Sequence, residues 1–187
     1  MMDRILLENC MAHLKEGHID AIDGVYQVMS KTVYLLAYSV LKDAEKAKDI
    51  MQETFIKVIE NIQKYELNTN AAAWISKIAR NLSLTEYVKS QRNVNIDLYD
   101  EKLIESGGNI FNDLKLSKAL DVLTLEEREV AVLYAVERYK HKEIAQILGK
   151  PLGTVLWIYN RALKKLKKQM ELLNTLDDTK SEGGVFL

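Results

Sequence analysis

Cysteine, proline and glycine are scarce in this 187-residue sequence, which contains one, one and eight of them. A single thiol, Cys10, cannot form a disulfide within the chain, and this fits a reducing, cytoplasmic environment. A β protein needs many turns, which proline and glycine favour. No segment approaches the roughly 20 consecutive apolar residues of a membrane-spanning helix, and the first residues lack the basic and apolar regions of a secretion signal. We therefore expect an all-helical, cytoplasmic protein that does not insert into a membrane.

Residues that commonly carry catalysis or bind metals are not clustered. His13, His18, His141 and Cys10 do not have the spacing of a metal site. The sequence also has neither a glycine-rich phosphate-binding loop nor a serine or cysteine nucleophile motif. It therefore predicts no metal, no cofactor, no small-molecule substrate and no enzymatic activity.

Apolar residues recur at helical spacing through most of the chain. In the first predicted helix the apolar stripe consists of Ile5, Leu6, Met11 and Leu14. Three longer helices are predicted over about 19–41, 43–62 and 70–92, and Asp43 and Asn70 are suited to cap the second and third of them. The amino-terminal part of the chain is therefore predicted to be a helical domain.

The helical pattern stops at residues 93–112, a stretch that is acidic and contains Gly107-Gly108. Such a stretch is typical of a flexible linker. The pattern resumes after it, and the last residues are again acidic and contain glycine. We therefore predict an all-α protein with an amino-terminal domain, a linker, a carboxy-terminal domain and a disordered tail, over residues 1–92, 93–112, 113–173 and 174–187.

The stretch at residues 142–155 reads KEIAQILGKPLGTV and has the spacing of a helix-turn-helix. The small Ala145 allows the second helix to cross at close range, and Gly149 can end the first helix because it adopts positive φ without a Cβ clash. Thr124 and Glu127 form a capping box for the preceding helix. A helix-turn-helix places its second helix in the major groove of DNA, so the carboxy-terminal domain is predicted to bind DNA.

Charge is balanced overall but unevenly distributed. The chain has a net charge of −1. Residues 138–168 contain nine Lys or Arg and a single acid, Glu143, whereas residues 93–129 contain four bases and nine acids. The basic segment coincides with the helix-turn-helix, so it is suited to contact phosphates. The alternative is a solvated, lysine-rich helix end that the helix dipole favours.

Two further strings lie in the amino-terminal domain: LKDAEKAKDIMQETFIKV at residues 41–58 and AWISKIARNLSLTEYVKSQR at residues 73–92. Followed by a linker and a helix-turn-helix, they resemble bacterial RNA polymerase sigma factors of the extracytoplasmic-function (ECF) class. The resemblance covers residues 17–92 and 114–168. It implies a subunit that binds core RNA polymerase and recognises and melts promoter DNA in transcription initiation. Such factors are commonly held inactive by an anti-sigma factor.

An acidic face on the first string is the candidate polymerase-binding site. Asp49, Gln52 and Glu53 lie three and four residues apart, so they share one helix face, with Ile50 and Val58 on the opposite, apolar face. Carboxylate and amide groups accept hydrogen bonds from arginine side chains. The resemblance implies that the partner is a coiled-coil segment of the largest polymerase subunits. The alternative is a solvated helix face.

The second string and the polar segment before it form the candidate site for the minus-ten promoter element. Its basic residues suit phosphates, its amide can hydrogen-bond a base edge, and its aromatic rings can stack on unpaired bases. The residues concerned are Tyr65, Trp74, Lys77, Arg80, Asn81, Lys89 and Arg92. The resemblance implies contact with flipped bases of the non-template strand, whereas Tyr65 and Trp74 are equally suited to the helical core.

The second helix of the helix-turn-helix is the candidate site for the minus-thirty-five element. The residues predicted to contact this DNA are Thr154, Leu156, Trp157, Asn160, Arg161, Lys164 and Lys165. Two positions that are basic in the family pattern are apolar here, which moves the expected phosphate contacts to Arg161, Lys164 and Lys165. Trp157 can contact thymine methyl groups or sugars, or it can pack against a partner protein or the other domain.

Two other functions fit parts of this pattern. A stand-alone helix-turn-helix regulator would dimerise through its helical domain, but it would not need the strings at 41–58 and 73–92. A sigma-like protein could bind polymerase without promoter activity, which the apolar departures on the recognition helix would allow. Both are kept as alternatives to a sigma factor.

Overall fold

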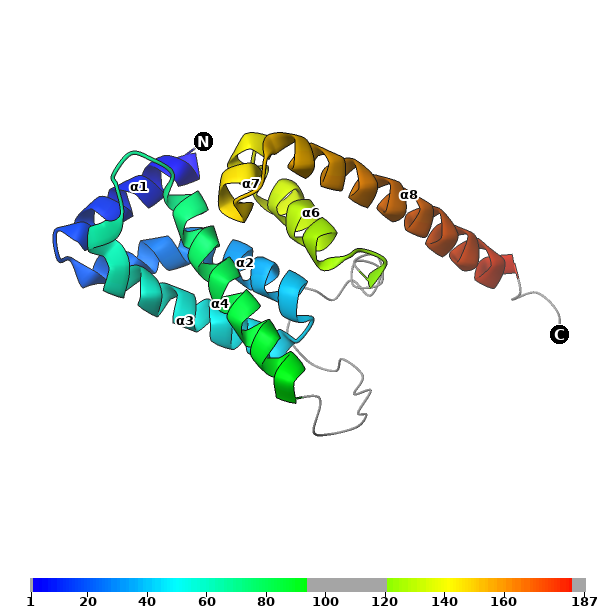
Figure 1. The fold of residues 1–187 in the computed structure, drawn as a ribbon, viewed down its shortest axis with the longest axis horizontal. Helices are drawn as coiled ribbons and strands as arrows, with labels where there is room; N and C mark the ends of the chain where they lie inside the picture. The colour runs from blue at the N-terminus through cyan, green and yellow to red at the C-terminus, as the bar shows by residue number, and fades with distance from the viewer. Residues whose placement is uncertain (1, 94–120, 183–187) are drawn as a thin grey trace.

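The computed structural model describes residues 2–93 and 121–182 (Figure 1). Nearly all of the predicted linker and the last five residues lie outside this part. The described residues form helices and no strand, which confirms the predicted all-α class. The longer helices are α1 (Met2–Lys15), α2 (Ile22–Leu41), α3 (Ala44–Asn61), α4 (Ala71–Asn93), α6 (Leu125–Glu137), α7 (His141–Leu148) and α8 (Leu152–Glu182). Two short 3₁₀ helices are η1 (Ile19–Ala21) and η2 (Ile62–Lys64).

The helix ends follow the predicted capping residues. The Asp43 carboxylate accepts hydrogen bonds from two backbone amides at the start of α3, both at 3.0 Å. Asn70 accepts one from the amide of Ala73 in α4 at 3.0 Å. Thr124 and Glu127 form the predicted capping box of α6, and Gly149 ends α7 at a φ of 63°. These local signals therefore fix where the helices begin and end.

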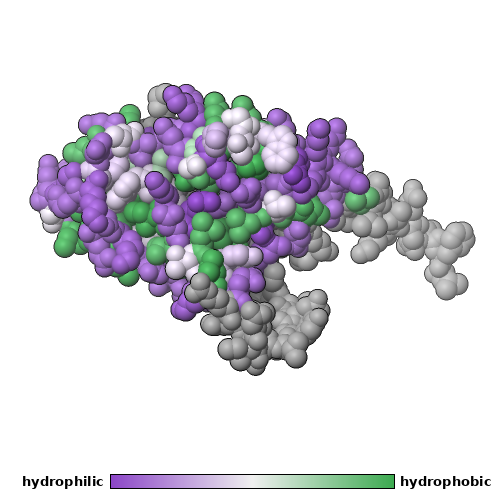
Figure 2. Space-filling model, viewed as in Figure 1, coloured by the Kyte–Doolittle hydropathy of each residue, from purple (hydrophilic) through white to green (hydrophobic). Residues whose placement is uncertain are grey.

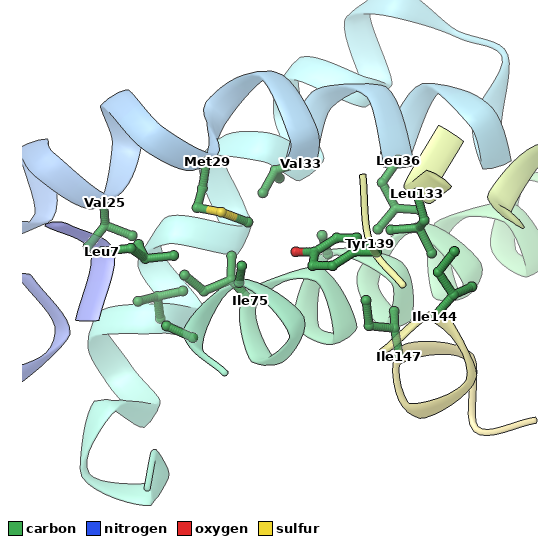
Figure 3. Packing of buried hydrophobic residues seen from close by; sticks show 14 of the residues in the cluster. Leu7, Val25, Met29, Val33, Leu36, Ile75, Leu133, Tyr139, Ile144 and Ile147 are labelled. Atoms are coloured by element: carbon green, nitrogen blue, oxygen red, sulfur yellow. The ribbon is translucent and has the colours of Figure 1, made fainter. Parts of the chain in front are cut away.

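Helix α2 lies at the centre of the molecule, between α1, α3 and α4 on one side and α6 on the other (Figure 1). Every residue from Thr32 to Val40 is buried. One cluster of buried side chains continues from Leu7 and Val25 through Ile75 to Tyr139 and Ile144 (Figure 3). The hydrophobic core is therefore shared by both predicted domains, which pack directly against each other.

The apolar stripe predicted for α1 is partly wrong. Ile5 and Leu6 are exposed, with 61% and 46% of their surface accessible, whereas Leu7, Met11 and Leu14 are buried. Positions 7, 11 and 14 are four and three residues apart, so they form one helix face toward α2. Ile5 and Leu6 lie outside that face and are left in solvent.

Helix α8 is longer than the sequence pattern predicts. It continues to Glu182, so residues 174–182 are helical where a disordered tail is predicted. The segment contains no glycine or proline before Gly183-Gly184, and nothing in it stops helix propagation. The distal part of α8 projects away from the rest of the molecule (Figure 1).

The surface is mostly hydrophilic on the face seen in Figure 2, with smaller hydrophobic patches between the polar residues. None of the helices described is both long and apolar enough to cross a membrane.

Candidate polymerase and nucleic-acid interfaces

The predicted polymerase-binding residues share an exposed face of α3. Asp49, Gln52 and Glu53 are all exposed, and no ion pair among the described residues uses either carboxylate. Ile56, which lies three residues after Glu53, extends the same face and has 55% of its surface exposed. The sequence analysis missed Ile56, although its place in the same helical series is the signal that could have identified it.

Two basic residues of α3 are already paired beside this face. Lys48 lies 2.8 Å from Glu45, and Lys57 lies 2.8 Å from Glu60. The hydrogen bonds and charges of these acids raise the pKa of Lys48 and of Lys57 above the usual value for lysine. The carboxylates of Asp49 and Glu53 are therefore the unpaired charges of this face.

The predicted minus-ten residues do not all lie in one environment. Lys77 and Asn81 are exposed one helical turn apart on α4. Lys89 is exposed near the end of α4, 3.8 Å from Glu86. The side chain of Arg92 lies outside the part that the structure describes.

Tyr65 and Trp74 belong largely to the core. Tyr65 is 1% exposed, and its hydroxyl donates a hydrogen bond to Glu8 at 2.8 Å. Burial, together with the hydrogen bond and charge of Glu8, raises the pKa of Tyr65 to about 12. Its ring centroid lies 5.3 Å from that of Trp74, which is half-buried. In this structure Tyr65 therefore ties α1 to the start of α4 and presents no ring to solvent.

Arg80 contacts the carboxy-terminal domain. Its Nε donates to Oε1 of Glu129 in α6 at 2.7 Å, and its Nη2 lies 3.4 Å from Oε2. The Glu129 side chain is fully buried and that of Arg80 is 16% exposed. Burial raises the pKa of Glu129 above its ordinary value, although the hydrogen bond and charge of Arg80 oppose this. Sequence reasoning missed Glu129, because the partner lies 49 residues away in the other domain.

The recognition helix α8 presents the predicted face to solvent. The exposed residues on it are Thr154, Leu156, Trp157, Asn160, Arg161 and Lys164. Val155, Ile158 and Ala162 lie on the buried side. Trp157 is 58% exposed, and the Arg161 guanidinium lies over its ring at 4.7 Å from the centroid. These side chains are therefore accessible on the outer face of α8.

Glu127 of α6 contacts two basic residues of this helix. It accepts a hydrogen bond from Lys165 at 2.6 Å and lies 3.2 Å from Nε of Arg161. Burial raises the pKa of Glu127, but the hydrogen bonds from Lys165 and the Thr124 amide, with the nearby positive charges, outweigh it and hold the pKa below the ordinary value. The carboxylate is therefore ionised and partly neutralises the basic face.

Comparison with known proteins agrees with this arrangement. Residues 25–93 match the family model Sigma-70 region 2, and residues 119–168 match Sigma-70, region 4. The ECF RNA polymerase sigma factor EcfG of Rhodopseudomonas palustris is 31% identical over 134 residues, which are 70% of this chain and 74% of that protein. The chain belongs to the ECF sigma factors of bacterial RNA polymerase. The ECF sigma factor SigW of Bacillus subtilis is 27% identical over 184 residues, 89% of this chain and 97% of that protein.

Two solved structures share the fold. The sigma factor RpoE from Bartonella quintana, in complex with the anti-sigma factor NepR, has a TM-score of 0.68 and 22% identity, over 80% of this chain and 96% of that chain. CnrH, in complex with the cytosolic domain of CnrY, has a TM-score of 0.67 and 20% identity, over 92% of this chain and 99% of that chain. The region 2 match covers most of α2 and all of α3 and α4, and the region 4 match covers α6, α7 and the first part of α8. This ECF sigma factor is therefore a promoter-recognising subunit.

Proposed function

We propose that this sigma factor binds core RNA polymerase through the exposed face of α3 and positions promoter DNA through α4 and α8. The observation that carries this is the presence, on one chain, of an unpaired acid–amide–acid face at Asp49, Gln52 and Glu53 and a separate exposed recognition helix. The α3 face suits arginine side chains of a partner. The polymerase supplies the phosphodiester chemistry, so the sigma factor itself is not an enzyme, and it acts where transcription takes place, in the cytoplasm.

Minus-ten DNA is engaged by α4 in this proposal. The side chains of Lys77, Asn81 and Lys89 are exposed and therefore accessible to DNA. We assign the two lysines to phosphates and Asn81 to a base edge. Arg80 joins them once it is released from Glu129. Trp74 is half-buried, and we assign it a stacking contact with a base, whereas Tyr65 is buried and supports the core.

Minus-thirty-five DNA is engaged by α8. The first turns of a recognition helix read base edges, and Thr154, Leu156 and Trp157 lie there, exposed. Lys164 is exposed farther along and suits a phosphate contact. One protein of similar fold, RpoE of Bartonella quintana, is in complex with the anti-sigma factor NepR, and we propose an anti-sigma factor as a further partner of this chain.

Co-elution with core RNA polymerase, followed by transcription of a genomic DNA pool, tests the proposal. The wild-type protein should co-elute with core and produce discrete new start sites. Replacing Asp49, Gln52 and Glu53 together with Ala should abolish both. Replacing Glu45 and Glu60, two paired acids of the same helix, should leave both intact. Unchanged core affinity in the triple variant would reject the α3 assignment, and co-elution without transcripts would favour the sigma-like protein that lacks promoter activity.

A further inference from the structure

Glu127 lies behind the recognition helix and joins it to α6. Its side chain is 4% exposed, its Oε2 accepts from Nζ of Lys165 at 2.6 Å, and its Oε1 lies 3.2 Å from Nε of Arg161. It is also the third residue of α6 and completes the capping box with Thr124. One buried carboxylate therefore links the start of α6 to two side chains that the sequence analysis predicts to contact DNA.

The Arg161 guanidinium has two neighbours that favour its position. Nε lies 3.2 Å from Oε1 of Glu127 as an ion pair and not as a hydrogen bond, and the guanidinium lies over the Trp157 ring at 4.7 Å, within the range of a cation–π interaction. Among the described residues no other ion pair or hydrogen bond uses Arg161, whose side chain is 49% exposed. Its terminal amino groups are therefore free. Those groups form the bidentate contact by which arginine recognises O6 and N7 of guanine in the major groove.

We propose that Glu127 is a positioning residue for promoter recognition, which orients Arg161 against Trp157 so that its free edge reads a guanine of the minus-thirty-five element. This rests on the proposed function. A guanidinium that is already fixed loses less side-chain freedom on binding, and this favours discrimination between bases. A carboxylate near DNA repels phosphates, so Glu127 should lower the overall affinity for DNA. Its favourable contribution is to the orientation of Arg161 and hence to base preference.

Replacement of Glu127 by Gln separates these effects. The amide keeps the size of the side chain and can still complete a capping box, but it removes the charge that holds Arg161 and Lys165. Initiation is measured with full-length protein and core polymerase at a start site mapped for the wild type, and again with each minus-thirty-five base pair substituted. The wild type should prefer guanine at one position, and Glu127→Gln should reduce that preference about tenfold. Affinity for unrelated DNA should rise, with a steeper dependence on salt.

Two matched variants identify the cause. Thr124→Ala removes the capping hydroxyl but keeps the carboxylate, so it should keep the base preference. Arg161→Gln should lose the preference, and adding Glu127→Gln to it should cause no further loss. An unchanged preference in Glu127→Gln, or the same loss in Thr124→Ala, would overturn the positioning role. Failure of the wild type to initiate with core polymerase would instead reject the proposed function on which the role rests.

Discussion

Two glycines near the turn of the helix-turn-helix have different backbone conformations. Gly149 has a φ of +63°, whereas Gly153 lies within α8, and a Cβ at either position would meet no atom within 4 Å. Left-handed backbone costs a residue with a side chain about 1–2 kcal/mol, and glycine within a helix costs about 0.5–1 kcal/mol relative to alanine. Gly149→Ala should therefore lower the free energy of unfolding by about 1 kcal/mol, and Gly153→Ala should raise it by about 0.5 kcal/mol. Urea denaturation measures both, and shifts of the same sign would contradict the argument.

Tyr65 should make the free energy of unfolding decrease at alkaline pH. Its pKa of about 12 in the folded protein lies above the usual 10.0, so the protonated phenol stabilises the fold fully below pH 10. That stabilisation is lost as pH rises from about 10 to about 12. Ultraviolet titration of the folded protein should show a late tyrosine ionisation that is absent in Tyr65→Phe. Tyr26→Phe, at an exposed position, should leave it in place.

At the scale of a helix, α3 combines an acidic face with one apolar side chain. Ile56 is 55% exposed, so a polar replacement should cost little stability. If it becomes buried on core polymerase, its loss removes about 1.5–3 kcal/mol of favourable burial. Ile56→Ser should therefore weaken core binding by about tenfold or more, measured by titration of labelled core. Ile5→Ser, which changes an equally exposed isoleucine on α1, should have no effect on core binding, and equal losses in the two variants would argue against a specific role for Ile56.

The helices also show which features can be predicted from sequence. Asp43, Asn70, Thr124 and Gly149 act within one turn of their own position, so spacing alone identifies them. The outward face of α8 follows from helical phase in the same way. The pairing of Arg80 with Glu129 depends on how two domains pack, and a one-dimensional pattern contains no signal for it.

The other differences between prediction and structure occur where the sequence pattern is weak or where apolar residues are adjacent. Ile5, Leu6 and Leu7 are consecutive apolar residues, and only packing against α2 decides that Leu7 is buried. Helix α8 continues through residues 174–182, which contain no glycine or proline, whereas an acidic composition had predicted disorder from residue 174. Composition is thus a poorer guide to the extent of a helix than the positions of glycine and proline.

At the scale of the whole molecule, the two domains share one hydrophobic core, so each domain packs against the other. Buried side chains from α1, α2 and α4 form one cluster with those of α6, α7 and α8. The stability of one domain therefore includes contacts with the other.

This coupling can be measured with the chain's two tryptophans, Trp74 in the amino-terminal domain and Trp157 on the recognition helix. In Trp157→Phe, an exposed substitution, fluorescence reports on Trp74 alone and circular dichroism on all helices. Coupled domains should give coincident denaturant transitions by the two probes. Val132→Asp places a charge where α6 meets α2 and should separate the transitions, whereas Val122→Asp, at an exposed position, should not. Separate transitions before any interface substitution would show that the domains fold independently and would contradict the coupling.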